Sequence, residues 1–283
     1  MELGGPKILV LGYPKAGKTG SLACMLDHYK LRVISLDGNI RPLLTYANPK
    51  ARKNLEVVML RDKQRILARQ QAPSPVGSPK TLERIDQLLD DGEFEDPNTK
   101  KSVKWGPVSE WGDDTILVID PLTALARIVM RRQLALSGRE RQGPLYRDWL
   151  LAQNVLDAWV EERTASDLKC GVMILAHLVM IEPKEAGEKD EEATKKIRSQ
   201  AAEVVPARLF PKTLGRALSP TIAQHFDATV LVEADGRSGR RYLVTAPQPH
   251  VDVGVPAVNL KDRLPIGDGM FTIYEALKKG PSA

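Results

Sequence analysis

A glycine- and lysine-containing motif near the start constrains this chain more than any other feature. Residues 12–19 fit the pattern G-x-x-x-x-G-K-[ST], directly between an apolar run and a helical stretch. In that context the motif predicts a P-loop, in which glycines let backbone N–H groups wrap around a phosphate. Lys18 would reach the β- and γ-phosphates, and the Thr19 hydroxyl would bind Mg²⁺. We therefore expect ATP to be bound by Gly12, Tyr13, Pro14, Lys15, Ala16, Gly17, Lys18, Thr19 and Gly20.

Short aliphatic runs alternate with helical patterns along the chain and predict its fold class. The runs lie at residues 7–11, 32–36, 57–60, 115–119 and 171–176. Runs that are apolar at nearly every position indicate a parallel sheet covered by helices on both faces. Residues 228–233 and 241–245 flank Asp-Gly and Ser-Gly pairs, which predict an antiparallel hairpin at the sheet edge. We expect an α/β fold in a single domain, residues 1–283.

Two polar stretches interrupt this pattern. Residues 93–114 mix charges, prolines and turn formers, which favours an irregular surface insertion. Residues 182–203 are rich in Glu, Lys and Ala without a clear apolar stripe, so this stretch is expected to be mobile or partly helical.

Composition excludes several classes of protein. The two cysteines, Cys24 and Cys170, lack metal-ligand spacing, and no apolar run approaches the roughly 20 residues of a membrane span. We therefore expect no membrane partner and a cytoplasmic location. The net charge of +5 weakly favours a polyanionic partner. Basic residues gather at 127–147, at 208–216 and at 237–241; solvation of the surface is the plainer explanation for each cluster.

A P-loop needs a carboxylate that holds the metal ion from a neighbouring strand. Asp120 ends the run at 115–119 and meets this requirement, together with Thr19. Asp120 also precedes Pro121, so it could instead cap a helix, and the two roles are compatible. Asp37, after the run at 32–36, is the carboxylate available to activate water.

The order of these features resembles the RecA-type ATPase core, most closely the phage RecA-like proteins linked to single-strand annealing and recombination. The resemblance extends from residue 7 to about residue 276 and rests on the P-loop, Asp120 and the strand order. In that family an acidic D-x-E pair follows the second strand, and here Asp37-Gly38-Asn39 stands there, with Asn39 in place of the Glu. The resemblance implies ATP hydrolysis, and the departure at Asn39 implies that it is slow. It also implies a phage origin, hence the cytoplasm of the host.

The resemblance assigns roles to other segments. His177 follows the run at 171–176, where the family has a polar sensor of the γ-phosphate, and is a predicted catalytic residue with Lys18 and Asp37. The two DNA-binding loops of the family correspond to residues 131–147 and 178–215, which contain two of the basic clusters. Contacts to the DNA backbone need basic side chains and little reading of bases. The expected contacts to single-stranded DNA are Arg131, Arg132, Arg139, Arg141, Arg147, Arg208, Lys212 and Arg216.

Lys261 and Arg263 resemble a basic pair of the family that reaches the triphosphate of a neighbouring subunit. Spacing by one residue puts both side chains on one face of a strand. A surface pair is the equally weighted alternative. The trans-acting role implies self-assembly into a filament or ring with ATP between subunits. A single-stranded-DNA-binding protein is a further expected partner.

Two other functions remain open from the sequence. Asn39 and Pro121 favour a protein that binds ATP for assembly without hydrolysing it. A P-loop kinase acting on a small acceptor would fit the fold and the basic residues near Arg131, although no compact lid motif is present and the C-terminal hairpin is unusual for kinases.

Overall fold

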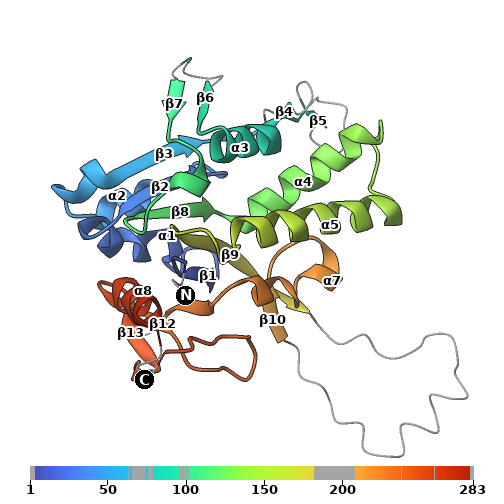
Figure 1. The fold of residues 1–283 in the computed structure, drawn as a ribbon. Coiled ribbons are helices and arrows are strands. Elements are labelled where there is room, and N and C mark those ends of the chain that lie inside the picture. Colours follow the sequence, from blue (N-terminus) through green and yellow to red (C-terminus); the bar gives the residue numbers. More distant parts are fainter. Residues whose placement is uncertain are drawn as a thin grey trace, which may run out of the picture.

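A central β-sheet runs through the protein, seen in a computed structural model (Figure 1). The structure describes residues 4–280 apart from 63, 66–73, 76–78, 96–99, 101, 182–207, 237 and 258. Strands β3, β2, β8, β9, β1 and β11 are parallel and adjacent in that order, and β12 and β13 continue the sheet antiparallel beyond β11. Their bounds are β1 Lys7–Gly12, β2 Lys30–Ser35, β3 Leu55–Met59, β8 Thr115–Asp120, β9 Gly171–Ile181, β11 Ala228–Ala234, β12 Arg241–Val244 and β13 Arg263–Pro265.

Helices cover both faces of this sheet. Because side chains alternate along a strand, Leu9 and Leu11 of β1 join one apolar cluster and Ile8 and Val10 join the other. Helices α3, α4 and α5 pack on the first face, and α1, α2 and α8 pack on the second (Figure 1). The helix bounds are α1 Lys18–Ser21, α2 Arg41–Tyr46, α3 Thr81–Asp90, α4 Leu122–Leu136, α5 Tyr146–Arg163, α7 Gly215–Leu218 and α8 Gly269–Lys279, with 3₁₀ turns η1 Ala23–Asp27, η2 Ala51–Asn54, η3 Val108–Glu110 and η4 Ile222–His225.

The predicted α/β fold with a mainly parallel sheet and a C-terminal antiparallel hairpin is confirmed. Every strand expected from an aliphatic run is present, to within two residues at its start. None of the helices in the described part of the chain is both long and apolar enough to cross a bilayer.

Residues 93–114 differ from the expected irregular surface insertion. They contain a small hairpin, β6 Glu93–Glu95 and β7 Ser102–Lys104, followed by η3. Phe94, Trp105 and Trp111 are buried in the main core, and the two tryptophan rings meet edge to face with centroids 5.9 Å apart. The expectation of an insertion outside the core was wrong because a few large apolar residues outweigh the surrounding charges.

Residues 178–215 are also more regular than the expected mobile loop. β9 continues to Ile181 and pairs antiparallel with β10, Arg208–Pro211, so both ends of this segment belong to a two-stranded ribbon. Residues 182–207, which include most of the acidic stretch, lie outside the described residues. A second small hairpin, β4 Gln64–Arg65 and β5 Ser74–Pro75, lies between β3 and α3.

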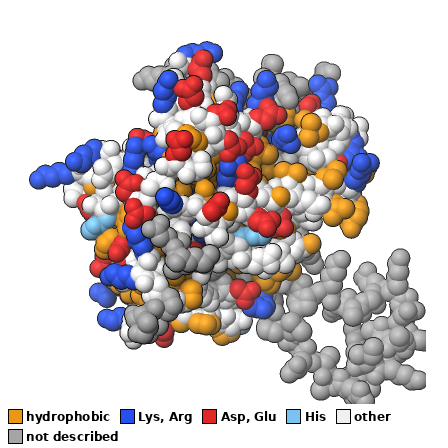
Figure 2. Space-filling model, in the orientation of Figure 1, with side chains coloured by type: hydrophobic (Ala, Val, Ile, Leu, Met, Phe, Trp, Pro, Cys, Tyr) orange, Lys and Arg blue, Asp and Glu red, His pale blue; other side chains and the backbone are white. Residues whose placement is uncertain are grey.

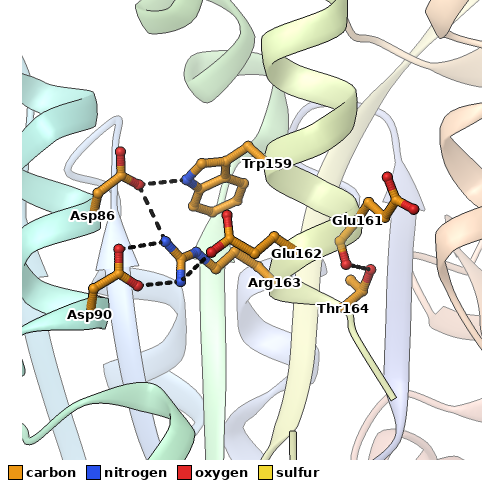
Figure 3. A network of polar contacts seen from close by, with 7 residues as sticks. All are labelled: Asp86, Asp90, Trp159, Glu161, Glu162, Arg163 and Thr164. Carbon is orange, nitrogen blue, oxygen red and sulfur yellow. Dashed lines mark hydrogen bonds and ion pairs between the residues drawn. The ribbon is translucent and has the colours of Figure 1, made fainter. Parts of the chain in front are cut away.

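A polar network joins α3 to α5 on the first face (Figure 3). The guanidinium of Arg163 donates to both carboxylate oxygens of Asp90, at 2.5 and 3.0 Å, while the Trp159 indole donates to Asp86 at 2.8 Å. Only 5% of the Arg163 side chain is exposed. The network therefore fixes the two helices that stand behind β8 and β9.

Candidate functional site

The predicted P-loop follows β1 at the sheet edge where the parallel strands end. Ligands of open α/β sheets bind at this edge. Gly12 must lack a side chain, because a Cβ there would lie 2.9 Å from the Val232 carbonyl oxygen. Gly17 has φ of +113°, a conformation that favours glycine, and it leads directly into α1. The motif thus forms a tight backbone loop, as a phosphate cradle requires.

Lys18 is held inside this loop. Its ammonium donates to the carbonyl oxygens of Gly12 at 2.8 Å and Tyr13 at 3.0 Å, and the residue is 6% exposed. Burial lowers the pKa of Lys18 to about 8, although the charges of Asp120 and Asp37 act in the opposite direction. A desolvated ammonium without a hydrogen-bonded carboxylate is suited to an anionic ligand such as a phosphate.

Asp120, at the end of β8, lies beside Thr19. The Thr19 hydroxyl donates to the Asp120 carboxylate at 2.8 Å, and Asp120 is 4% exposed. Burial raises the pKa of Asp120 to about 6, and the Thr19 hydrogen bond acts against this shift. The sheet register creates this contact, since β8 and β1 both flank β9 and all three strands end at the same edge.

The Thr19–Asp120 pair fits Mg²⁺ in a particular way. Magnesium usually takes one or two protein oxygens and completes an octahedron with water and substrate phosphates. Among the described residues, no cluster of three His, Cys, Asp or Glu could hold a metal ion by itself. A hydroxyl and a buried carboxylate beside the phosphate loop therefore suit a metal that arrives with its nucleotide.

A cavity of about 380 Å³ gathers these residues with other predicted ones. Asp37 and Asn39 follow β2 at its edge, and the Asp37 carboxylate accepts the Asn39 backbone N–H at 2.9 Å. Both side chains are exposed. The described residues that line this cavity include no glutamate, and its carboxylates are Asp37 and Asp120.

His177 lies within β9 rather than at its tip, because the strand continues to Ile181. Its Nδ1 is 3.1 Å from the Lys18 ammonium, so Nδ1 accepts from Lys18. Burial, assisted by the Lys18 charge, lowers the pKa of His177. The His177 carbonyl accepts the Lys212 backbone N–H at 2.7 Å, and the Lys212 carbonyl accepts from the Thr123 hydroxyl at 3.1 Å. Hydrogen bonds thus link the P-loop to β10 and α4.

Lys261 and Arg263 lie apart from this cavity in their own chain. Lys261 precedes β13 and Arg263 begins it, so the two do not share one strand as the spacing predicted. Both side chains are exposed, and the Arg263 guanidinium contacts the Glu233 carboxylate at 3.2 Å. Arg263 lines another cavity, of about 600 Å³, on the other side of the loop.

The structure distributes the predicted DNA-binding residues over two regions. Arg131 and Arg132 lie on α4, where Arg132 approaches Glu83 at 3.8 Å. Arg139 is paired with the buried carboxylate of Asp148, whose backbone contacts help to hold the turn between α4 and α5. The first predicted DNA-binding loop is therefore largely helical, with Arg141 in the turn and Arg147 in the first turn of α5.

In the second region the ribbon holds the basic residues. Arg208 starts β10 and pairs with Asp252, Lys212 follows β10, and Arg216 lies on α7. Several of the predicted guanidinium groups therefore already have a carboxylate partner and would exchange it on binding DNA. Exposed Arg141, Arg147 and Lys212 form no ion pair with any described residue.

Comparisons with known proteins extend to the fold. No protein-family model matches the chain, and no curated protein matches it. Among solved structures the chain is similar to a KaiC-like protein from the hyperthermophilic archaeon Pyrococcus horikoshii OT3, with 9% identity, 93% of this chain and 85% of that chain covered, and a TM-score of 0.40. It is also similar to the ATPase domain of a DnaB-family protein, with 12% identity, coverage of 88% and 79%, and a TM-score of 0.35.

The fold is RecA-like. The strand order, with β9 between the P-loop strand and the strand that ends in Asp120, carries this assignment, because the structural likenesses are distant. The predicted fold is thus confirmed, and the narrower relation to phage recombination proteins stays a prediction.

Sequence reasoning missed two residues of the 380 Å³ cavity. Arg41 could have been found, because it begins the helix that follows β2 at the same sheet edge. Tyr46 carried no signal in the sequence, since it enters the site only through the packing of α2 against α1.

Proposed function

We propose that this protein binds Mg-ATP in the P-loop and is a RecA-like ATPase with slow hydrolysis. The observation that carries the proposal is the Thr19–Asp120 hydrogen bond of 2.8 Å beside the buried Lys18 ammonium. In this role Lys18 donates to the β- and γ-phosphates, and Thr19 and Asp120 hold Mg²⁺. When bound, the metal ion would neutralise charge on the phosphates and support their transfer.

Slow hydrolysis is supported by the carboxylates around the cavity. Asp120 is committed to the metal, so Asp37 is the remaining carboxylate in the cavity that could orient water. Asp37 is exposed to solvent and already accepts the Asn39 N–H, which leaves its pKa without help from burial. His177, which accepts from Lys18, is the proposed sensor of the γ-phosphate.

Single-stranded DNA is the proposed polymer partner. Tyr146 is 84% exposed at the start of α5, and Arg147 follows it directly. Trp149 and Leu136 add exposed apolar surface at the same end of α4 and α5, where Figure 2 shows hydrophobic and basic side chains together at the right edge. Aromatic rings with neighbouring arginines suit stacked bases and a phosphate backbone, with little sequence preference.

Assembly through the nucleotide is the proposed role of Lys261 and Arg263. Both are exposed and lie away from the Lys18 cavity of their own chain, so contact with a triphosphate would have to come from a neighbour. Arg263 would first leave Glu233, an exposed pair of low strength. A filament or ring that holds single-stranded DNA would serve annealing or strand exchange in recombination.

A protein that uses ATP only for assembly is the second candidate. The absence of a glutamate among the described residues of the nucleotide cavity favours it.

The test measures ATP turnover with and without single-stranded DNA, with sizing in the presence of a non-hydrolysable ATP analogue. Turnover stimulated by DNA, together with assembly, is expected for the proposed ATPase. Assembly without turnover would favour the second candidate. Transfer of phosphate to an added nucleoside or nucleotide would contradict both and indicate a kinase. Tyr146→Ala should weaken binding of single-stranded DNA, and unchanged binding would remove α5 from the proposed interface.

A further inference from the structure

A bridge between two side chains crosses the P-loop from outside it. Arg241, the first residue of β12, donates from Nη1 to the Tyr46 hydroxyl at 3.1 Å. Tyr46 ends α2, which lies on the far side of α1. These residues are 195 positions apart, so only the tertiary fold brings them together. We call this contact the Tyr46–Arg241 bridge.

The bridge lies directly against the phosphate loop. A Cβ at position 17 would lie 2.8 Å from Arg241 Cδ, and a Cβ at position 20 would lie 2.9 Å from the Tyr46 ring. Gly17 and Gly20 therefore let Arg241 and Tyr46 close over the start of α1. Neither glycine could be replaced without moving one of these side chains.

The bridge also divides two cavities. Gly17, Tyr46 and Arg241 line both the 380 Å³ cavity that contains Lys18 and Asp120 and a second cavity of about 570 Å³. The second cavity is otherwise lined by residues that include Ala23, Cys24 and Ile266 and lacks the phosphate-binding side chains. Its volume is within the usual range for small-molecule sites, and its walls are mixed apolar and polar.

The guanidinium of Arg241 is incompletely satisfied. Its Nε is buried and has no hydrogen-bond partner among the described residues. Within the same part of the chain, no carboxylate forms an ion pair with Arg241, whereas Arg263 of the neighbouring strand is paired with Glu233. A buried N–H donor without an acceptor is unfavourable, and a charged oxygen would relieve it.

We propose that Arg241 binds the nucleotide in cis. Its bond to the Tyr46 hydroxyl is exchanged for an oxygen of the phosphate nearest the sugar, and the nucleoside occupies the 570 Å³ cavity beneath the Tyr46 ring. The proposal rests on nucleotide binding by the P-loop, and it extends that site to the C-terminal hairpin. A charged phosphate oxygen is a stronger acceptor than a phenol, which favours the exchange. Arg241 thus differs from Lys261 and Arg263, whose proposed action is on a neighbour.

The test is isothermal titration calorimetry with Mg-ATP and with Mg-tripolyphosphate, which lacks the nucleoside. Arg241→Met should weaken binding of both ligands roughly tenfold or more, the effect of losing a charged hydrogen bond. Arg240→Met removes the same charge from the adjacent, exposed position and should leave both affinities unchanged. Equal affinities of Arg241→Met and Arg240→Met would overturn the proposal.

Tyr46→Phe gives an independent result, because it keeps the ring and removes only the hydroxyl that competes for Arg241. Mg-ATP should bind roughly threefold more tightly to this variant, since one neutral hydrogen bond no longer has to be broken. Weaker binding to Tyr46→Phe would contradict the exchange, even if Arg241→Met proved unable to fold. Wild-type protein should bind Mg-ATP more tightly than Mg-tripolyphosphate, and equal affinities would exclude the nucleoside from the cavity.

Lys18→Met separates the two levels of the argument. Loss of ATP binding in Lys18→Met together with full binding in Arg241→Met would overturn the role of Arg241 and leave the P-loop assignment intact. Full binding in Lys18→Met would instead remove the proposed nucleotide site itself.

Discussion

Lys18→Met should make the protein more stable without nucleotide and less stable than wild type with it. The pKa of Lys18 is lowered from 10.5 to about 8 by burial. A lowered pKa means that the folded state holds the proton less well than the unfolded chain, so at neutral pH the charged lysine destabilises the fold. Each pKa unit corresponds to about 1.4 kcal/mol, which makes this cost about 3 kcal/mol.

Methionine removes that cost but leaves two acceptors without their donor. The carbonyl oxygens of Gly12 and Tyr13 accept from Lys18 in the wild type, and each lost hydrogen bond costs about 1 kcal/mol. The net gain is about 1 kcal/mol, or roughly 2–4 °C in Tm for a domain of this size. With Mg-ATP at about 100 times its Kd the wild type gains about 2.7 kcal/mol, while the variant gains little. The order of the two Tm values should therefore reverse.

Thermal unfolding of both proteins with and without Mg-ATP tests this reversal. Lys53→Met, which removes an exposed lysine elsewhere, controls for the change in net charge and should behave as wild type. A Tm below that of the wild type without nucleotide would refute the burial argument. An ATP-induced shift of full size in Lys18→Met would refute contact between Lys18 and the phosphates.

Three further results are expected. Asp120→Asn should still bind ATP but lose the increase in affinity that Mg²⁺ gives to the wild type, as measured by calorimetry with and without the metal; an intact increase would remove Asp120 from the metal site. Affinity for metal-free ATP should be full below pH 8 and fall as pH rises above it, because the pKa of free Lys18 is about 8 and bound phosphates raise it; a flat profile from pH 7 to about 9.5 would argue against a charged Lys18 in the complex. Arg163→Met should lower the free energy of unfolding by about 2 kcal/mol, reduced from the value for a buried pair because Asp90 is 49% exposed, while Glu161→Gln should have no effect in the same denaturant titration.

Local pattern was sufficient for the strands of the parallel sheet, because burial on both faces demands apolar residues at nearly every position. It was insufficient for β10 and β13, which are short and half exposed. Residues 93–114 misled for the opposite reason, since Trp105 and Trp111 are buried within a stretch of high charge.

The same distinction applies to the candidate site. The P-loop is contiguous in sequence, and Asp120, Asp37 and His177 could be placed because parallel strands end at one edge of the sheet. The Tyr46–Arg241 bridge depends on how α2 and the C-terminal hairpin meet across α1, and no sequence pattern records that meeting.

Charge balance explains why the site is better suited to hold a nucleotide than to cleave it. Among the described residues that line the 380 Å³ cavity, Lys15, Lys18, Arg41 and Arg241 are cationic. Asp37 and Asp120 oppose them, which leaves an excess of two positive charges. Mg²⁺ would raise this excess to about four, close to the charge of an ionised triphosphate, since a terminal phosphate carries nearly two charges. The cavity is therefore nearly neutral once filled, and any further carboxylate that could act as a base would disturb that balance.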